Sequence, residues 1–243
     1  MNIYIYDQTK TLYHDASMRI ISRVRQQPDT ILGLATGQSP LGVYHEMIRD
    51  CVSNHTSYGQ ILTFNLDEYV GLSPNHEQSY YHFMHRELFG PLSISANHTH
   101  IPSGIANSLD KECVRYDQLL DTHTIDIQIL GIGSNGHIGF NEPGTPFDSK
   151  THVITLDAKT RKDNSRFFTG LDEVPTQAIT MGIHHILKAK EIILIAVGNR
   201  KSDAVYRMIK GPITTDCPAS VLQNHPNVHV FLDTAAAQKM TES

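Results

Sequence analysis

Apolar and polar positions follow two periods along this chain, one typical of strands and one typical of helices. Short apolar runs with the composition of buried strands occur at residues 1–6, 30–35, 60–66, 125–130, 191–197 and 228–232. Between these runs the apolar residues recur every three or four positions, as Leu12, Ala16, Ile20 and Val24 do. This period predicts amphipathic helices over residues 12–24, 40–49, part of 79–89, 108–120, 200–209 and a short segment after 232.

Strands and helices therefore alternate along the chain. This order favours an α/β fold with a mainly parallel sheet flanked by helices, a Rossmann-like open sheet. The chain of 243 residues is long enough to bury a sizeable core. No internal repeat, low-complexity tract or linker composition interrupts it, so we expect residues 1–243 to form a single domain.

Composition excludes several classes of partner. A formal net charge of −5 gives no reason to expect broad affinity for nucleic acids or membrane surfaces, so an anionic ligand would need a local positive pocket. No apolar run approaches the ~20 residues of a membrane span, and residues 1–6 lack the pattern of a signal peptide. Three scattered cysteines favour reduced thiols and a cytoplasmic location over a disulfide framework.

The apolar run at 125–130 leads into a glycine-rich loop, residues 131–143. Glycine lets main-chain N–H groups approach a ligand closely, and ligands of open α/β sheets lie outside the carboxyl ends of the strands. His137 adds an imidazole, a group that titrates near neutral pH, and Glu142 adds a carboxylate that can tune or relay its proton. We therefore predict a functional site at this loop.

Gly131, Gly133 and Gly136 also match the dinucleotide-binding fingerprint. That fingerprint requires a helix that starts at its last glycine and an acidic residue about 20 positions later. Here the loop continues into residues 143–144, a Pro-Gly pair that cannot form a helix interior. We therefore do not expect a nucleotide at this loop.

Asp67 directly follows the apolar run at 60–66, so it is predicted at the same edge of the sheet as His137. The alternative is that Asp67 only caps a turn or a helix, as aspartates after strands often do.

A second loop, residues 35–39, closes one predicted strand and opens the next helix. Ser39 is the expected N-cap and Pro40 the expected first helical residue. Free N–H groups at a helix N-terminus bind anions, here with Thr36, Gly37, Gln38 and Ser39 around them. A plain capped turn is the alternative, and the Gly-Lys-Ser/Thr ending of a Walker A loop is absent.

Fifteen histidines raise the question of a metal site. None of the close pairs has the spacing of HExxH or of a Cys/His zinc site, and none has a carboxylate in a recognisable ligand frame. The pairs are His82/His85, His98/His100 and His184/His185. We predict no metal and no other cofactor.

Four segments of the chain resemble the signature blocks of the glucosamine-6-phosphate deaminase family. They are residues 64–72, 79–85, 136–143 and 164–168. They occur in the order and spacing of that family, and the resemblance covers nearly the whole chain. It implies an enzyme of amino-sugar catabolism that converts glucosamine 6-phosphate and water to fructose 6-phosphate and ammonium, with a sugar phosphate as its small-molecule partner and without a metal.

The resemblance also implies catalytic roles. Asp67 corresponds to the base that moves the C2 proton, and His137 to the group that opens the sugar ring, with Glu142 as its charged partner. Asn135 stands where some members carry an aspartate of the same relay. An amide can fix a histidine tautomer but cannot stabilise an imidazolium by charge, which leaves Glu142 as the expected charged partner.

Substrate contacts follow from the same resemblance. The phosphate is expected at Arg166 and Lys201 and at the loop of Thr36, Gly37, Gln38 and Ser39, and Gly136 is expected to contact the substrate. Without the resemblance, both cations read as ordinary surface charges, the role expected for Arg200.

The resemblance also bears on regulation and oligomeric state. Longer, hexameric members of the family are activated by N-acetylglucosamine 6-phosphate, which basic residues and a C-terminal extension bind. In this chain a strand at 152–156 carries His152 and Ile154 at those basic positions, and the chain stops at Ser243, so we expect no activation and a monomer or small homo-oligomer.

Two alternative functions remain. One is a 6-phosphogluconolactonase, an enzyme that we would not expect to carry the Asp-Glu-Tyr of residues 67–69 or the Phe-Asn-Glu of residues 140–142. The other is a non-catalytic sugar-phosphate sensor of a transcription regulator, but no segment outside the α/β pattern is left to form its helix-turn-helix.

Overall fold

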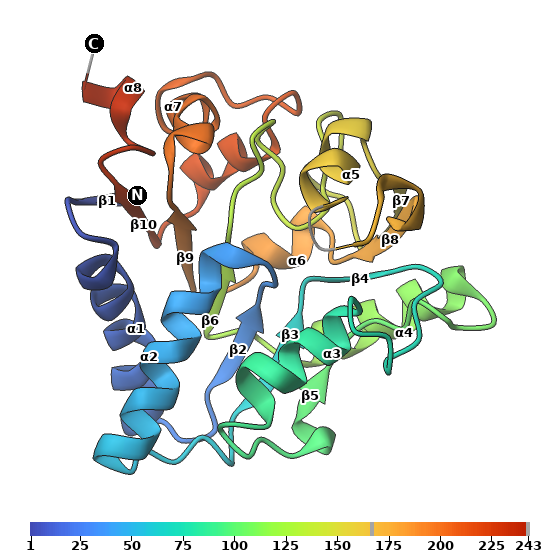
Figure 1. The fold of residues 1–243 in the computed structure, drawn as a ribbon, viewed down its shortest axis with the longest axis horizontal. Coiled ribbons are helices and arrows are strands. Elements are labelled where there is room, and N and C mark those ends of the chain that lie inside the picture. The colour runs from blue at the N-terminus through green and yellow to red at the C-terminus, as the bar shows by residue number, and fades with distance from the viewer. Residues whose placement is uncertain (166–167, 242–243) are drawn as a thin grey trace.

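The computed structural model describes residues 1–165 and 168–241, without the side chains of Lys159, Asp163 and Thr241. Its main sheet has seven strands in the order β1-β10-β9-β6-β2-β3-β5 (Figure 1). These strands are β1 (Asn2–Tyr6), β2 (Ile31–Leu34), β3 (Leu62–Asn65), β5 (Thr99–His100), β6 (Ile127–Leu130), β9 (Glu191–Ala196) and β10 (Val228–Asp233). Every neighbouring pair is parallel, which confirms the predicted α/β fold.

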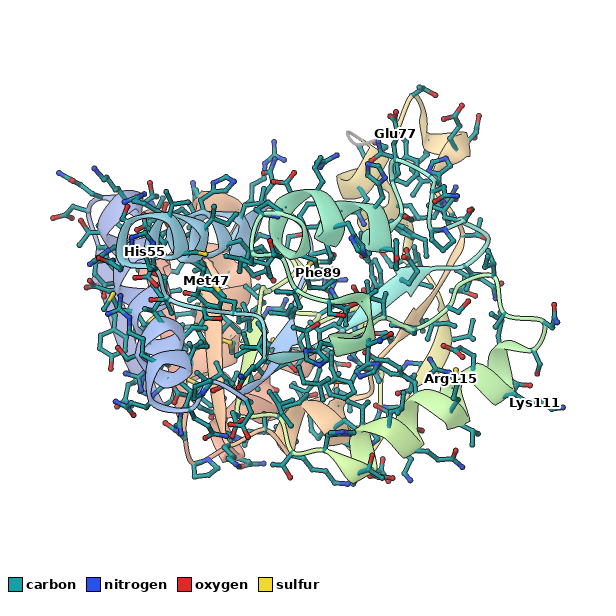
Figure 2. All side chains as sticks on the ribbon, turned by 90° about the horizontal axis from the view of Figure 1, so that it is seen from below. Met47, His55, Glu77, Phe89, Lys111 and Arg115 are labelled. Carbon is teal, nitrogen blue, oxygen red and sulfur yellow. The ribbon has the colours of Figure 1, made fainter. Side chains whose placement is uncertain are left out.

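Helices cover both faces of this sheet. One face carries α1 (Thr9–Gln26), α2 (Gln38–Asn54), α3 (Tyr80–Met84) and the π-helical turn that continues α3 (His85–Phe89). The other face carries α4 (Leu109–Thr122), α6 (Ile183–Leu187), α7 (Ser202–Lys210) and α8 (Gln238–Thr241). Seen from below, Met47 and Phe89 lie inside the first layer, whereas Lys111 lies at the outer end of α4 (Figure 2).

Strand β9 shows why every residue after its first, Glu191, is apolar. Ile193 and Ile195 pack in the first layer, and Ile192 and Leu194 pack in the second. A parallel strand that is buried on both faces cannot carry the alternating polar residues of a half-exposed strand. The same two-sided burial holds the carboxyl ends of the central strands in fixed positions, from which the loops described below emerge.

A second, antiparallel sheet of three strands was not predicted as a sheet. Its order is β4-β8-β7, with β4 at Asp67–Tyr69, β8 at Gln177–Thr180 and β7 at His152–Thr155. The strand expected at 152–156 is β7, but the run at 60–66 is shorter than predicted. The chain leaves β3 at Asn65 and enters β4 at Asp67, so Asp67 begins a strand instead of capping a turn. Helix α5 (Ala158–Asn164) lies beside this small sheet (Figure 1).

The start of α2 also differs from the prediction. The helix begins at Gln38, directly after Gly37, whose φ is 86°. Ser39 therefore lies in the first turn and is not the N-cap, so the prediction of a Ser39 cap was wrong. The left-handed φ at Gly37, which favours glycine, turns the chain sharply out of β2. Short 3-10 turns complete the fold at Ala96–His98, Leu171–Glu173, Asn199–Lys201 and Pro218–Asn224. Among the described residues, no helix combines the length and hydropathy needed to cross a membrane.

Candidate active site

Loops from the carboxyl ends of β2, β3, β6 and β9 surround one cavity of about 1070 Å³. Ligand pockets of enzymes have volumes of this order. The chain runs from β2 outward to β3, whereas β6 lies on the other side of β2, so the cavity sits at the point where the strand order reverses. The loops after β2 and β6 touch, because a Cβ at Gly131 would lie 3.4 Å from Ser39 Oγ.

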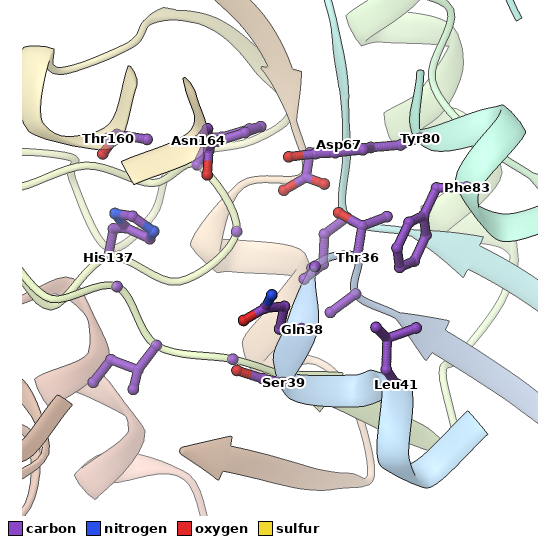
Figure 3. Close-up of a pocket in the computed structure, with 18 of the residues that line it drawn as sticks. Thr36, Gln38, Ser39, Leu41, Asp67, Tyr80, Phe83, His137, Thr160 and Asn164 are labelled. Carbon is purple, nitrogen blue, oxygen red and sulfur yellow. The ribbon is translucent and has the colours of Figure 1, made fainter. Parts of the chain in front are cut away.

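His137 lines the cavity, and Asn135 and Glu142 lie behind it. The Nδ1 atom of His137 is 3.4 Å from Glu142 Oε2, an ion-pair distance. The side-chain amide of Asn135 donates to the same carboxylate oxygen at 2.7 Å. The Oδ1 atom of Asn135 accepts from the backbone N–H of His137 at 3.2 Å. The structure therefore brings these three predicted residues together, with the imidazole toward the cavity (Figure 3).

The His137 loop is held tightly by its own backbone and by the segment before β10. Gly133 N–H donates to His137 O at 2.9 Å, and Arg207 Nη2 donates to Asn135 O at 2.9 Å. Gly136 has a φ of 96°, and a Cβ at Gly136 would lie 2.7 Å from Cys217 Sγ. Gly136 is thus required by packing against Cys217, and it does not line the cavity where we expected a substrate contact.

The Glu142 carboxylate is buried among hydrogen-bond donors. Burial alone would raise its pKa, but His137, then Thr160 and Asn135, outweigh burial and hold the pKa of Glu142 below its usual value. A carboxylate kept ionised beside an imidazole can orient the ring and stabilise its protonated form. Glu142 has the environment that this role requires.

Asp67 has the opposite environment. Its side chain is buried, and Oδ1 has no hydrogen-bond partner within the described part of the chain. Burial, and secondarily the charge of Glu68, raise the pKa of Asp67 from 3.8 to about 8. A Cβ at Gly139 would lie 3.7 Å from Asp67 Oδ2, so this carboxyl contacts the loop that carries His137.

Glu68, the next residue, has a structural task. Its Oε1 accepts from Tyr69 N at 2.8 Å and Tyr80 N at 2.9 Å, and its Oε2 accepts from Tyr81 N at 2.9 Å. Burial raises the pKa of Glu68 to about 7, although these three N–H groups oppose that shift. Glu68 thereby joins β4 to the first turn of α3 and fixes the backbone next to Asp67.

The loop expected to bind phosphate lines the lower side of the cavity in Figure 3, where Thr36, Gln38 and Ser39 are labelled. Gly37 lines it as well. Lys201 also lines the cavity, and its Nζ donates to Ile132 O in the loop after β6 at 2.7 Å. Arg166 lies outside the described residues. Arg200 is exposed, as expected, but it also lines the mouth of the cavity.

Several lining residues were not predicted to have a role. Thr160 and Asn164 come from α5; in Figure 3 Thr160 lies above His137, and Asn164 lies between Thr160 and Asp67. Tyr80 and Phe168 belong to blocks that resemble the deaminase family, so that resemblance carried a signal for them. Thr160 lies outside every such block, and no local pattern marks it.

One histidine pair lies closer to carboxylates than its spacing suggested. Asp121 of α4 lies beside His184 and His185 of α6, with one ligand-type atom of each within 4.8 Å of the others. The expectation that no carboxylate stands in a ligand frame with these histidines was wrong, because helix packing brings together residues that are far apart in the chain. Lys188 Nζ lies 2.8 Å from Asp121 Oδ1, so a cation already accompanies this carboxylate.

The fold and the cavity agree with comparisons with known proteins. Residues 7–231 match the model of the family described as glucosamine-6-phosphate isomerases/6-phosphogluconolactonase, and the chain belongs to this family. Curated relatives are more specific. A glucosamine-6-phosphate deaminase of Streptococcus thermophilus is 54% identical over 86% of this chain and 87% of its own length. A glucosamine-6-phosphate deaminase of Clostridium novyi is 47% identical over 99% of this chain and 100% of its own.

Among solved structures, a deaminase is similar in both fold and sequence, and a lactonase in fold alone. A monomeric glucosamine-6-phosphate deaminase superposes with a TM-score of 0.96 at 43% identity, covering 98% of this chain and 99% of that one. The 6-phosphogluconolactonase of Trypanosoma brucei reaches a TM-score of 0.79 at 17% identity, covering 98% of each chain. The lactonase therefore shares the fold, while the deaminases share much of the sequence as well.

Proposed function

We propose that this protein converts D-glucosamine 6-phosphate and water to D-fructose 6-phosphate and ammonium. The observation that carries the proposal is the pair of unlike carboxylates at one cavity. Asp67 has a raised pKa, and its Oδ1 has no hydrogen-bond partner among the described residues, whereas Glu142 has a lowered pKa and is held beside His137. Two titratable groups whose environments separate their pKa values suit separate roles as base and as charge stabiliser.

The first step is opening of the pyranose ring. His137 takes the proton of the anomeric hydroxyl and returns a proton to the ring oxygen, so the C1–O5 bond breaks and the aldehyde forms. Glu142, at 3.4 Å from Nδ1, stabilises the imidazolium between the two transfers. Asn135 keeps the carboxylate in place through its bond of 2.7 Å to Oε2.

Asp67 acts on the open chain. The aldehyde acidifies the proton on the amine-bearing C2, which the Asp67 carboxylate takes and then delivers to C1, through an enolamine. The product is an imine at C2, and addition of water followed by loss of ammonia gives the ketone. The ionised form of Asp67 is the one that reacts, and because the raised pKa makes it bind the transferred proton more strongly, abstraction from carbon is favoured.

The substrate phosphate is assigned to the loop after β2. Free N–H groups at the start of α2, the Ser39 hydroxyl and the Lys201 ammonium lie around one part of the cavity. Arg166, expected from the sequence, completes the proposed phosphate site. Gly136 supports the His137 loop here and has no proposed contact with the substrate.

The proposal further treats residues 1–243 as one domain that acts in the cytoplasm, as a monomer or a small homo-oligomer, with no nucleic acid or membrane partner. Met181, at the end of β8, packs in the same core as Phe64 of β3, which supports one domain. Cys51, Cys113 and Cys217 are free thiols, which supports a reducing compartment. The solved relative described as monomeric supports the monomer.

Two assays on the purified protein test the proposal. Ammonium and fructose 6-phosphate are measured after addition of glucosamine 6-phosphate, with and without a chelator, and hydrolysis of 6-phosphogluconolactone is measured in parallel. We expect equal amounts of ammonium and fructose 6-phosphate, undiminished by chelation. Lactone hydrolysis without ammonium release would overturn the proposal, and loss of activity on chelation would overturn the absence of a metal.

A further inference from the structure

We propose that Thr160 is a positioning residue for ring opening, which sets the Glu142 carboxylate against His137 and joins helix α5 to the proton relay. This inference rests on the proposed function. Thr160 Oγ1 donates to Glu142 Oε1 at 2.6 Å, and both side chains are buried. Hydrogen bonds from a neutral donor to a charged group are among the stronger ones in proteins.

The geometry around Glu142 shows what this hydroxyl does. Oε2 faces Asn135 at 2.7 Å and His137 at 3.4 Å, both on the loop that also carries Glu142. Oε1 faces Thr160, which comes from a different element. With donors on both oxygens the carboxylate cannot rotate about its Cγ–Cδ bond without losing a partner. Thr160 therefore fixes the orientation in which Oε2 meets the imidazole.

Helix α5 reaches the other half of the site as well. Asn164 lies four residues after Thr160, on the same face of the helix. Its amide donates to the Tyr69 hydroxyl at 2.9 Å, and Tyr69 ends the strand β4 that Asp67 begins. One face of α5 thus contacts the relay at Thr160 and the strand of the proposed base at Asn164, so the position of α5 determines the alignment of both.

Thr145 provides a matched control. It is a buried threonine whose hydroxyl also donates to Glu142, at 2.7 Å, but to the backbone carbonyl oxygen instead of the carboxylate. Replacing Thr145 by valine removes a hydrogen bond of the same kind to the same residue, and leaves both carboxylate oxygens with their partners. Thr160→Val and Thr145→Val therefore separate the carboxylate contact from local packing.

The first measurement is turnover. Thr160→Val should lower kcat for ammonium release by about tenfold, the effect of losing a hydrogen bond to a charged group, while KM changes little. Thr160→Ser, which keeps the hydroxyl, should retain most of the wild-type kcat. Thr160→Ala, which like Thr160→Ser lacks the methyl group but also lacks the hydroxyl, should show the loss seen in Thr160→Val. Wild-type kcat in Thr160→Val, or equal losses in Thr160→Ser and Thr160→Ala, would overturn the proposal.

The second measurement isolates ring opening. In an Asp67→Asn background the later steps are blocked, and NMR exchange between the anomers of glucosamine 6-phosphate reports the opening and closing of the ring. Adding Thr160→Val should slow this exchange about tenfold. It should also move the acid limb of the exchange rate to higher pH, because loss of a donor raises the pKa of Glu142. A purely structural role would not move that limb.

The controls distinguish an error in the role of Thr160 from an error in the proposed function. Thr145→Val in the same background should leave the acid limb in place, and a shift equal to that of Thr160→Val would contradict a specific role for the Thr160 hydroxyl. Wild-type protein that releases no ammonium would refute the proposed function. Normal ammonium release with unchanged kcat in Thr160→Val would refute the role of Thr160 alone.

Discussion

Replacing Asp67 by asparagine should make this protein more stable and inactive at the same time. The carboxyl is buried, Oδ1 has no partner in the described part of the chain, and its pKa is raised from 3.8 to about 8. At pH 7 an unfolded chain ionises this group, whereas the folded protein keeps it mostly protonated. The interval between the unfolded-chain pKa of 3.8 and pH 7 is about three pH units. At about 1.36 kcal/mol per unit, the buried carboxyl lowers the free energy of unfolding at pH 7 by an amount on the order of 4 kcal/mol.

The asparagine removes the titration but keeps the shape. Its amide also lacks a partner, which costs about 1–3 kcal/mol. The net expectation for Asp67→Asn is a gain of about 1–3 kcal/mol in the free energy of unfolding at pH 7. Turnover should be abolished, since the base is gone, while affinity for inorganic phosphate should remain, because the phosphate is assigned to the start of α2 and to Lys201 and not to the Asp67 side chain.

The sign of the pH dependence follows from the raised pKa of Asp67. Below pH 3.8 both states are protonated and the carboxyl costs nothing. As pH rises toward about 8 the unfolded chain alone loses the proton, so the cost grows, and above 8 it is constant. The difference in unfolding free energy between Asp67→Asn and wild type should therefore widen between pH 4 and pH 8 and then level off.

Urea unfolding monitored by circular dichroism across this pH range measures the difference. Asp126→Asn is the matched control, since Asp126 is equally buried but accepts from Ile31 N at 2.8 Å and Lys190 Nζ at 2.7 Å. That substitution should destabilise the protein. A difference for Asp67→Asn that stays constant from pH 4 to pH 8, or that narrows, would refute the assignment of Asp67 as an unpartnered carboxyl with a raised pKa.

Three further outcomes are expected. His137→Gln should slow anomer exchange and turnover of closed-ring substrate, while substrate already in the open form reacts much better; equal losses on both forms would place His137 in the later step too. Lys201→Ala should raise KM far more than it lowers kcat, and competition titrations with inorganic phosphate should show the same loss of affinity; an unchanged KM would remove Lys201 from the phosphate site. With His152 and Ile154 on β7 in place of two basic residues, substrate dependence should be hyperbolic and unaffected by N-acetylglucosamine 6-phosphate, and sigmoidal kinetics that this compound abolishes would contradict the prediction.

The sequence predicted the parts of the fold that local periodicity governs. The run at 191–197 is apolar at every position after Glu191, and residues 191–196 of it form the two-sided strand β9. The small sheet escaped prediction because β4 has only three residues and follows β3 almost without interruption. A segment of that length contains too few positions for a period to be visible, and its pairing with β8, more than a hundred residues later, is tertiary.

Among single residues of the site, too, the sequence predicts what a local pattern marks and misses what a tertiary contact defines. His137 and Glu142 could be predicted because they follow a strand within a glycine-rich loop, a pattern that chemistry explains, whereas the role of Asp67 followed from the resemblance to the deaminase family. Thr160 could not, because its hydroxyl is defined by a contact with Glu142, eighteen residues away and in a different element. Likewise, the pKa values of the two buried carboxyls differ because donors surround Glu142 and not Asp67 Oδ1 among the described residues, and that difference depends on tertiary contacts.

The two carboxylates also explain why one cavity can run both an acid–base relay and a carbon deprotonation near neutral pH. Ring opening needs a carboxylate that stays charged, and the neighbouring His137 together with hydrogen bonds from Thr160 and Asn135 holds the pKa of Glu142 low. Deprotonation of carbon needs a base that gains by accepting a proton, and burial without a partner gives Asp67 that property at the expense of stability. The two demands are incompatible at a single site. The fold meets them with different surroundings: donors from the His137 loop and from helix α5 surround Glu142, whereas Asp67 begins a short strand and is buried with its Oδ1 unpartnered among the described residues.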